Sequence, residues 1–134
     1  MDTEVVEFET GGEFAVTDLT GAVARFLRGR GDGLLSVFAP HATAGIALIE
    51  TGAGTEADLR AAVDRLVPRD ANYRHAHGSP GHGGDHVLPA FVSSSLVVPV
   101  IGGEPALGTW QSIVLVDPNR DNRRRRVRLS FLAG

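Results

Sequence analysis

Four of the five histidines in this chain lie between positions 75 and 86, namely His75, His77, His82 and His86. Imidazole exchanges protons near neutral pH and is the commonest metal ligand among protein side chains. Glycine and proline fill much of the same segment, which therefore offers little packing surface: Gly78, Pro80, Gly81, Gly83 and Gly84. The pattern indicates a metal-binding or proton-transfer site on a loop.

The histidines differ in how much support their surroundings give. His82 and His86 have the i, i+4 spacing that would place both rings on one helix face, but Gly83-Gly84 disfavours a helix, although a loop could still bring them together. His77 has no further support and is interpreted as structural or solvated. His41 follows a predicted strand, where a side chain is fixed yet accessible; a capping or core role is the equal alternative.

Two carboxylates could assist such a site. Glu50 ends a predicted strand and shares its face with Ile46 and Leu48, so burial would raise its pKa and make it a proton carrier, while a surface ion pair is equally compatible. Asp85 precedes His86 and could orient an imidazole, although adjacent side chains often point apart.

Trp110 and Gln111 follow Gly108-Thr109 at the start of the most apolar predicted strand. By themselves they are interpreted as a core tryptophan and its neighbour. Beside a pocket they would offer a stacking surface and an amide.

Arginines occupy every position of the run Arg123–Arg126, which at first sight suggests a nucleic-acid patch. From Arg126 onward, however, charged and polar residues alternate with Val127, Leu129 and Phe131, which favours a strand with one charged and one core face. A phosphate ligand could still use one of these arginines, because a guanidinium matches phosphate oxygens bidentately.

Hydrophobic periodicity predicts the elements that position these residues. Apolar spacing predicts a helix over 19–27 with Thr17 or Asp18 as N-cap, and a second over 55–67 with Thr55 and Asp58 as a capping box. A brief helix interrupted by Pro89 is expected over 87–92. Apolar or alternating runs predict strands over 4–9, 34–39, 43–50, 96–101, 107–116 and 124–132.

Composition limits the class of protein. A length of 134 residues, 43% of them hydrophobic, suits one compact domain spanning 1–134. No apolar run is long enough to cross a membrane, and the acidic, alternating N-terminus is unlike a signal peptide, so we expect a cytoplasmic protein without membrane contact. The net charge of -3 argues against nucleic acid as a partner, and with no cysteine any metal must be held by nitrogen and oxygen.

Four segments together resemble one known family. They are Pro40-His41-Ala42-Thr43-Ala44-Gly45, Asn72-Tyr73-Arg74-His75, His86 with its following apolar turn, and Leu107-Gly108-Thr109-Trp110-Gln111. In order and spacing they resemble the YjbQ-like family, described as secondary thiamine-phosphate synthase. The resemblance spans nearly the whole chain, and the pairing of the first and last segments is more specific than any single histidine motif.

The resemblance implies a compact α+β domain with a mixed or antiparallel β-sheet core and two amphipathic helices, assembled as a homotrimer. It implies metal ligation by His41, His75 and His86, with an acidic residue at Glu50. His77 and His82 stand where other members carry other residues, so no role is transferred to them. Ala42 stands where the family often has threonine or serine, which removes a hydroxyl contact.

The chemistry of three neutral imidazoles agrees with that implication. Such a set, with an open position, suits a divalent metal, zinc above all, which activates water or polarises a phosphoryl oxygen. We therefore expect a metal-assisted enzyme with weak thiamine-phosphate synthase activity on a phosphorylated small molecule, with Glu50 carrying protons and Trp110 and Gln111 at the catalytic site. Two alternatives stay open: a metal-dependent hydrolase of a phosphorylated or acyl small molecule, and a non-catalytic metal- or anion-binding oligomeric module.

Overall fold

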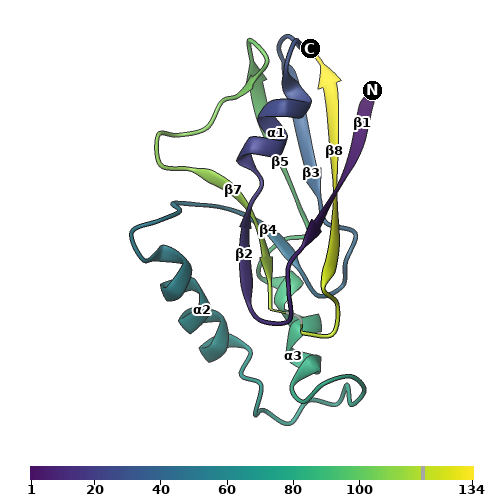
Figure 1. Ribbon diagram of the computed structural model, residues 1–134, viewed down its shortest axis with the longest axis vertical. Coiled ribbons are helices and arrows are strands. Elements are labelled where there is room, and N and C mark those ends of the chain that lie inside the picture. Colours follow the sequence, from purple (N-terminus) through teal and green to yellow (C-terminus); the bar gives the residue numbers. More distant parts are fainter. Residues whose placement is uncertain (119) are drawn as a thin grey trace.

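Two antiparallel sheets form the framework of the computed structural model, which describes residues 1–118 and 120–134 (Figure 1). The larger sheet has the order β1-β8-β3-β5-β6. Its strands are β1 Asp2–Glu9, β8 Arg124–Ala133, β3 Gly33–Phe38, β5 Ser95–Ile101 and β6 Glu104–Pro105. The smaller sheet has the order β2-β7-β4, with β2 Ala15–Asp18, β7 Ser112–Asp117 and β4 Gly45–Ile49. The expectation of a single α+β domain is confirmed.

Strand β8 shows why this chain folds as a sheet with one core face. Val127, Leu129 and Phe131 are buried, whereas the arginines that alternate with them at 124, 126 and 128 are exposed. Burial of each large apolar side chain contributes about 1.5–3 kcal/mol. The interpretation of the arginine run as part of a two-faced strand is therefore confirmed for these positions.

Helix α1, Thr20–Leu27, covers the inner face of the larger sheet. Its buried side chains recur at the predicted helical spacing, and three of them, Val23, Phe26 and Leu27, join the main core. The predicted N-cap, Thr17 or Asp18, is wrong by at least one residue, because Leu19 is the N-cap and its side chain makes no capping bond. Asp18 lies just before it, and its carboxylate Oδ1 accepts a hydrogen bond from the Thr20 amide at 2.9 Å.

Helix α2, Thr55–Leu66, lies along one side of the molecule and contributes Val63 to a second core cluster (Figure 1). The predicted capping box is wrong. Gly54 precedes the helix in the left-handed conformation, and the carboxylate of Glu56 instead accepts the Gly52 amide at 2.8 Å. The predicted start of the helix is correct, but the helix begins after a turn over residues 52–54 and not at a capping box.

Two predicted elements have different bounds. The strand over 107–116 is wrong in its first half, because Gly108 and Gln111 hydrogen-bond to each other in a turn and β7 starts only at Ser112. The brief helix over 87–92 begins earlier, as α3 His82–Val87, and continues as a 3₁₀ turn over Leu88–Ala90. Among the described residues, no helix combines the length and apolar character needed to cross a bilayer.

Candidate histidine site

Helix α3 lies at the end of the molecule opposite the two chain termini (Figure 1). Although Gly83-Gly84 disfavours a helix, the two glycines lie within α3, and the reason is steric. A Cβ at Gly83 would lie 2.6 Å from the Tyr73 Cβ, and one at Gly84 would lie 2.8 Å from the Tyr73 hydroxyl. The tyrosine packs against the helix and donates its hydroxyl proton to the Pro68 carbonyl at 2.7 Å. Glycine here costs helix propensity of about 1 kcal/mol per residue but allows this close approach.

The helix brings all four clustered histidines together. The ring centroid of His75 lies 3.9 Å from that of His77 and 4.3 Å from that of His86. His82 and His86 lie on one face of α3, with centroids 4.7 Å apart and their Nε2 atoms at 3.1 Å. The i, i+4 spacing was the signal for His82, which the family pattern had left without a role.

Two carboxylates lie beside the His82 ring, although Nδ1 does not reach hydrogen-bonding geometry with a partner among the described residues. This Nδ1 lies 3.2 Å from Asp121 Oδ2 and 3.5 Å from Asp85 Oδ2. Asp121 also accepts the Ser79 amide at 2.9 Å, and this hydrogen bond lowers the pKa of the Asp121 carboxyl below its usual range. Asp85 thus contacts His82 rather than His86, the neighbour considered from the sequence.

Arg69 anchors this arrangement from the segment that follows α2. Its Nη2 donates to both Asp85 carboxylate oxygens, at 3.0 and 2.9 Å, and to the Pro118 carbonyl at 2.6 Å. Burial raises the pKa of Asp85, and the charge of Arg69 opposes that rise. One guanidinium therefore fixes α3, the loop after β7 and, through Asp85, the ring of His82.

The donor chemistry of the cluster suits a nitrogen-ligated metal. Burial lowers the pKa of His86, and the neighbouring histidines lower it further, so its ring is neutral near pH 7 and keeps a free lone pair. His75 Nδ1 is buried without a hydrogen-bond partner among the described residues. His82 and His86 share a hydrogen bond between their Nε2 atoms at 3.1 Å, and this separation is close to the roughly 3.3 Å between two nitrogens on tetrahedral zinc. Within 1–118 and 120–134, however, no three His, Asp or Glu side chains already stand as a complete ligand set.

His41, the third predicted metal ligand, contacts a different part of the molecule. Its Nε2 lies 2.9 Å from the Arg126 amide nitrogen and 3.1 Å from the Arg126 carbonyl oxygen, beyond the end of β3. It lines a hollow of about 450 Å³ together with Arg124 and Arg125. The structure thus brings His75 and His86 together but not His41, whose role as a ligand stays a prediction.

A pH dependence follows from the surroundings of His41. Burial lowers its pKa from 6.5, and the nearby Arg125 charge lowers it further, so the unfolded chain binds this proton more tightly than the folded chain. The contribution of His41 to stability is fully present above about pH 6.5 and is lost as the pH falls through the lower folded-state pKa. We expect the stability advantage of wild type over His41→Gln in urea unfolding to shrink between about pH 7.5 and pH 5. A constant difference would contradict the neutral ring accepting the Arg126 amide.

Glu50, Trp110 and Gln111 lie on the surface. Glu50 is exposed because β4 ends at Ile49, so the expected burial of its carboxylate is wrong. Trp110 is 74% exposed in the turn before β7, and the Gln111 side chain accepts the Gly108 amide at 2.8 Å. None of the three is a core residue, and their catalytic roles stay predictions.

Arg125 is the buried residue that sequence reasoning missed. Its guanidinium is 1% exposed and donates to both oxygens of Asp117 at 2.8 Å and to the Thr43 hydroxyl at 2.9 Å. The signal was available, since Arg125 has the same strand parity as Val127 and therefore faces the core. This ion pair joins β8 of the larger sheet to β7 of the smaller sheet.

Gly83→Ala tests the packing that builds the histidine cluster. The added methyl group must displace Tyr73, so we expect a loss of about 1–3 kcal/mol in the free energy of unfolding. Gly31→Ala is the matched control, because its Cβ meets no atom within 4 Å and the change restricts only the unfolded chain. Equal stability of the two variants in urea titrations would show that Tyr73 does not confine α3.

Comparison with known proteins agrees with this fold. The family described as UPF0047 protein YjbQ-like matches residues 4–134. A UPF0047 protein of Mycobacterium tuberculosis is 61% identical over 134 residues, covering 100% of both chains. A UPF0047 protein of Methanothermobacter thermautotrophicus is 32% identical, covering 96% of this chain and 90% of that protein.

Solved structures show the same architecture. A hypothetical protein of Aeropyrum pernix superposes with a TM-score of 0.89 at 31% identity and covers 100% of both chains. A YbjQ-like protein of unknown function from Sulfolobus solfataricus superposes with a TM-score of 0.92 at 23% identity, covering 99% of this chain and 97% of that one, a likeness of fold. With its two antiparallel sheets and its family match over nearly its full length, this chain belongs to the UPF0047 YjbQ-like family.

Proposed function

We propose that this protein is a metal-assisted enzyme acting on a phosphorylated small molecule, with the cluster of His75, His77, His82 and His86 as its metal site. The observation that carries the proposal is the approach of four imidazoles, with two Nε2 atoms 3.1 Å apart. Zinc is the favoured ion, because neutral imidazole nitrogens are among its preferred ligands.

The ligands would come from His75, His82 and His86. When bound, a divalent ion would neutralise charge on a departing phosphate or diphosphate. Asp121 and Asp85 lie 3.2 and 3.5 Å from His82 Nδ1, on the side of the ring opposite Nε2, so Nε2 faces His86 and would be the donor atom. Arg69 holds Asp85 in place. His41 would join the set only if another copy of the chain, or a rearrangement of its own loop, brought it there.

We propose that the protein has weak thiamine-phosphate synthase activity, which can be assayed directly. The substrates are a pyrimidine methyl diphosphate and a thiazole phosphate, and release of diphosphate reports turnover. We expect turnover that a chelator abolishes and that His86→Ala reduces about 100-fold or more, since outer partners of metal ligands alone are worth about 10–100-fold. Arg65→Gln, an exposed change on α2, is the control.

Two outcomes would refute the proposal. The first is turnover that His86→Ala leaves unchanged, which would place the reaction elsewhere. The second is an absence of metal-dependent turnover on these substrates and on a panel of phosphate esters and acyl esters. In that case a protein that still binds metal would be a binding module.

We further propose that the chain assembles as a homotrimer through the outer face of its larger sheet. Leu34, Val97, Ile101 and Leu132 are all about half exposed or more on that face, and Leu34 lies opposite Leu132 in the register. Such a contiguous apolar patch favours an interface. We expect Val97→Lys to lower the mass measured by sedimentation equilibrium toward the 14.1 kDa of one chain, while Ala57→Lys on exposed α2 leaves it unchanged. Retention of the trimer in Val97→Lys would place the interface elsewhere.

A further inference from the structure

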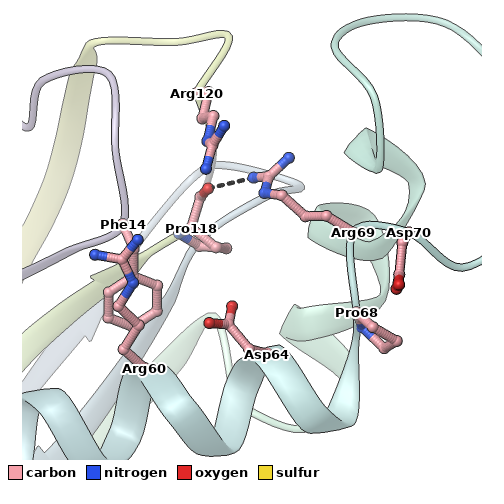
Figure 2. Close-up of a pocket in the computed structure, with 8 residues that line it drawn as sticks. All are labelled: Phe14, Arg60, Asp64, Pro68, Arg69, Asp70, Pro118 and Arg120. Atoms are coloured by element: carbon pink, nitrogen blue, oxygen red, sulfur yellow. Dashed lines mark hydrogen bonds between the residues drawn. The ribbon is translucent and has the colours of Figure 1, made fainter.

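A second hollow, of about 360 Å³, lies between α2, the Arg69 segment and the loop after β7 (Figure 2). This volume falls within the roughly 300–1,000 Å³ of small-molecule sites. Three arginines line it: Arg60 on α2, Arg69 just after that helix, and Arg120 from the distant segment that follows β7. Arginine matches the oxygens of phosphate with paired N–H groups.

The three arginines are not equivalent. Arg69 donates hydrogen bonds to Asp85 and to the Pro118 carbonyl, so its side chain is held in place at the side of the hollow. Arg60 lies over the ring of Phe14, at 5.9 Å from the centroid, and within the described part of the chain neither Arg60 nor Arg120 forms an ion pair. Among the residues that the structure describes, the guanidinium groups of Arg60 and Arg120 thus have no carboxylate partner, and an anion could bind them.

Two carboxylates line the same hollow, those of Asp64 and Asp70. Asp64 lies one turn after Arg60 on α2, and Figure 2 shows its carboxylate directed into the space below Arg120 and Arg69. Residues four apart on a helix commonly pair, yet Arg60 stacks over Phe14 and makes no ion pair with Asp64. Opposite charges thus stand on the walls of one hollow without contacting each other.

We propose that this hollow binds a small phosphorylated molecule that carries a positively charged group at its other end. Arg60 and Arg120 bind the phosphate, and Asp64 binds the cationic group. A phosphate alone would gain the two guanidinium contacts but would be repelled by Asp64, so the ligand with both charges binds more tightly.

The hollow adjoins the histidine cluster through one residue. Arg69 lines the hollow and holds Asp85, whose Oδ2 lies 3.5 Å from His82 Nδ1. The role of this ligand as a substrate rests on the function proposed above, whereas its binding does not depend on a metal.

Calorimetric titration at constant ionic strength tests the site, with phosphoethanolamine and inorganic phosphate as probes. We expect phosphoethanolamine to bind more tightly than phosphate. Arg60→Gln and Arg120→Gln should each weaken both probes about 10- to 100-fold, the worth of a charge-assisted hydrogen-bonded pair. Arg65→Gln, on the same helix but outside the hollow, should leave both affinities unchanged.

Asp64→Asn tests the contact with the cationic end of the ligand independently of the contact with its phosphate. We expect it to weaken phosphoethanolamine and to tighten inorganic phosphate, so that the preference between the probes is lost or reversed. Equal effects of Arg60→Gln and Arg65→Gln, or an unchanged preference in Asp64→Asn, would overturn the proposal. His86→Ala should keep phosphoethanolamine binding, so a failure of the metal site and a failure of this hollow give different results.

Discussion

Arg125→Met is expected to lower the free energy of unfolding by about 3–5 kcal/mol, a large part of the roughly 5–15 kcal/mol typical of a domain. The Arg125 guanidinium is 1% exposed, and its removal leaves the Asp117 carboxylate buried without its cationic partner. The lost bonds also include the one to the Thr43 hydroxyl, which ties the loop after His41 to β8. Urea titration followed by circular dichroism measures the change.

Two further variants establish that burial, not charge, causes the effect. Arg126→Met is the matched control, because that side chain is 66% exposed and its ion pair with Glu7, at 3.2 Å, contributes about 0–1 kcal/mol. The double variant Arg125→Met with Asp117→Leu should lose less than the sum of the two single changes, since no buried charge is then left unpaired. Similar losses in Arg125→Met and Arg126→Met would contradict this account.

Strand β8 and helix α1 could be predicted because the patterns that specify them lie within short stretches of the sequence. Alternation along β8 and the helical spacing of α1 depend on neighbouring residues alone, and both elements lie within one or two residues of their expected bounds. The start of β7 could not be found in this way, because the Gln111 side chain closes a turn with Gly108 that competes with the strand. Arg125 was misjudged because a run of like charges obscured its parity with Val127.

The histidine site shows a different limit. Gly83-Gly84 opposes a helix by propensity, and only the packing of Tyr73 against both glycines explains why α3 forms. That packing joins residues ten or more positions apart, so no local pattern reveals it. The carboxylate of Asp121 reaches His82 from the loop after β7, a contact that requires the complete fold. Conversely, the surface position of Glu50 follows from a strand that ends one residue earlier than predicted.

Removal of single histidines is expected to have the largest effect on metal binding. Tag-free wild type should carry close to one divalent ion per chain by mass spectrometry, and His75→Ala, His82→Ala and His86→Ala should each lose it. His86 is the most informative, because it contacts both His75 and His82 and its neutral ring keeps a lone pair. Asp121→Asn should weaken affinity only about 10- to 100-fold, as expected for a residue that orients a ligand.

The His41→Ala variant distinguishes a site within one chain from a shared one. Within one chain, His41 Nε2 already accepts the Arg126 amide, so its loss should leave metal content unchanged. Loss of metal in His41→Ala but not in His82→Ala would instead support ligation by His41, His75 and His86, with His41 reaching the other two from a second copy. Metal-free wild type that still folds would contradict both sets, and the cluster would then act through proton transfer or anion binding. Measuring all four alanine variants together therefore identifies the ligand set from which substrates and assembly can be interpreted.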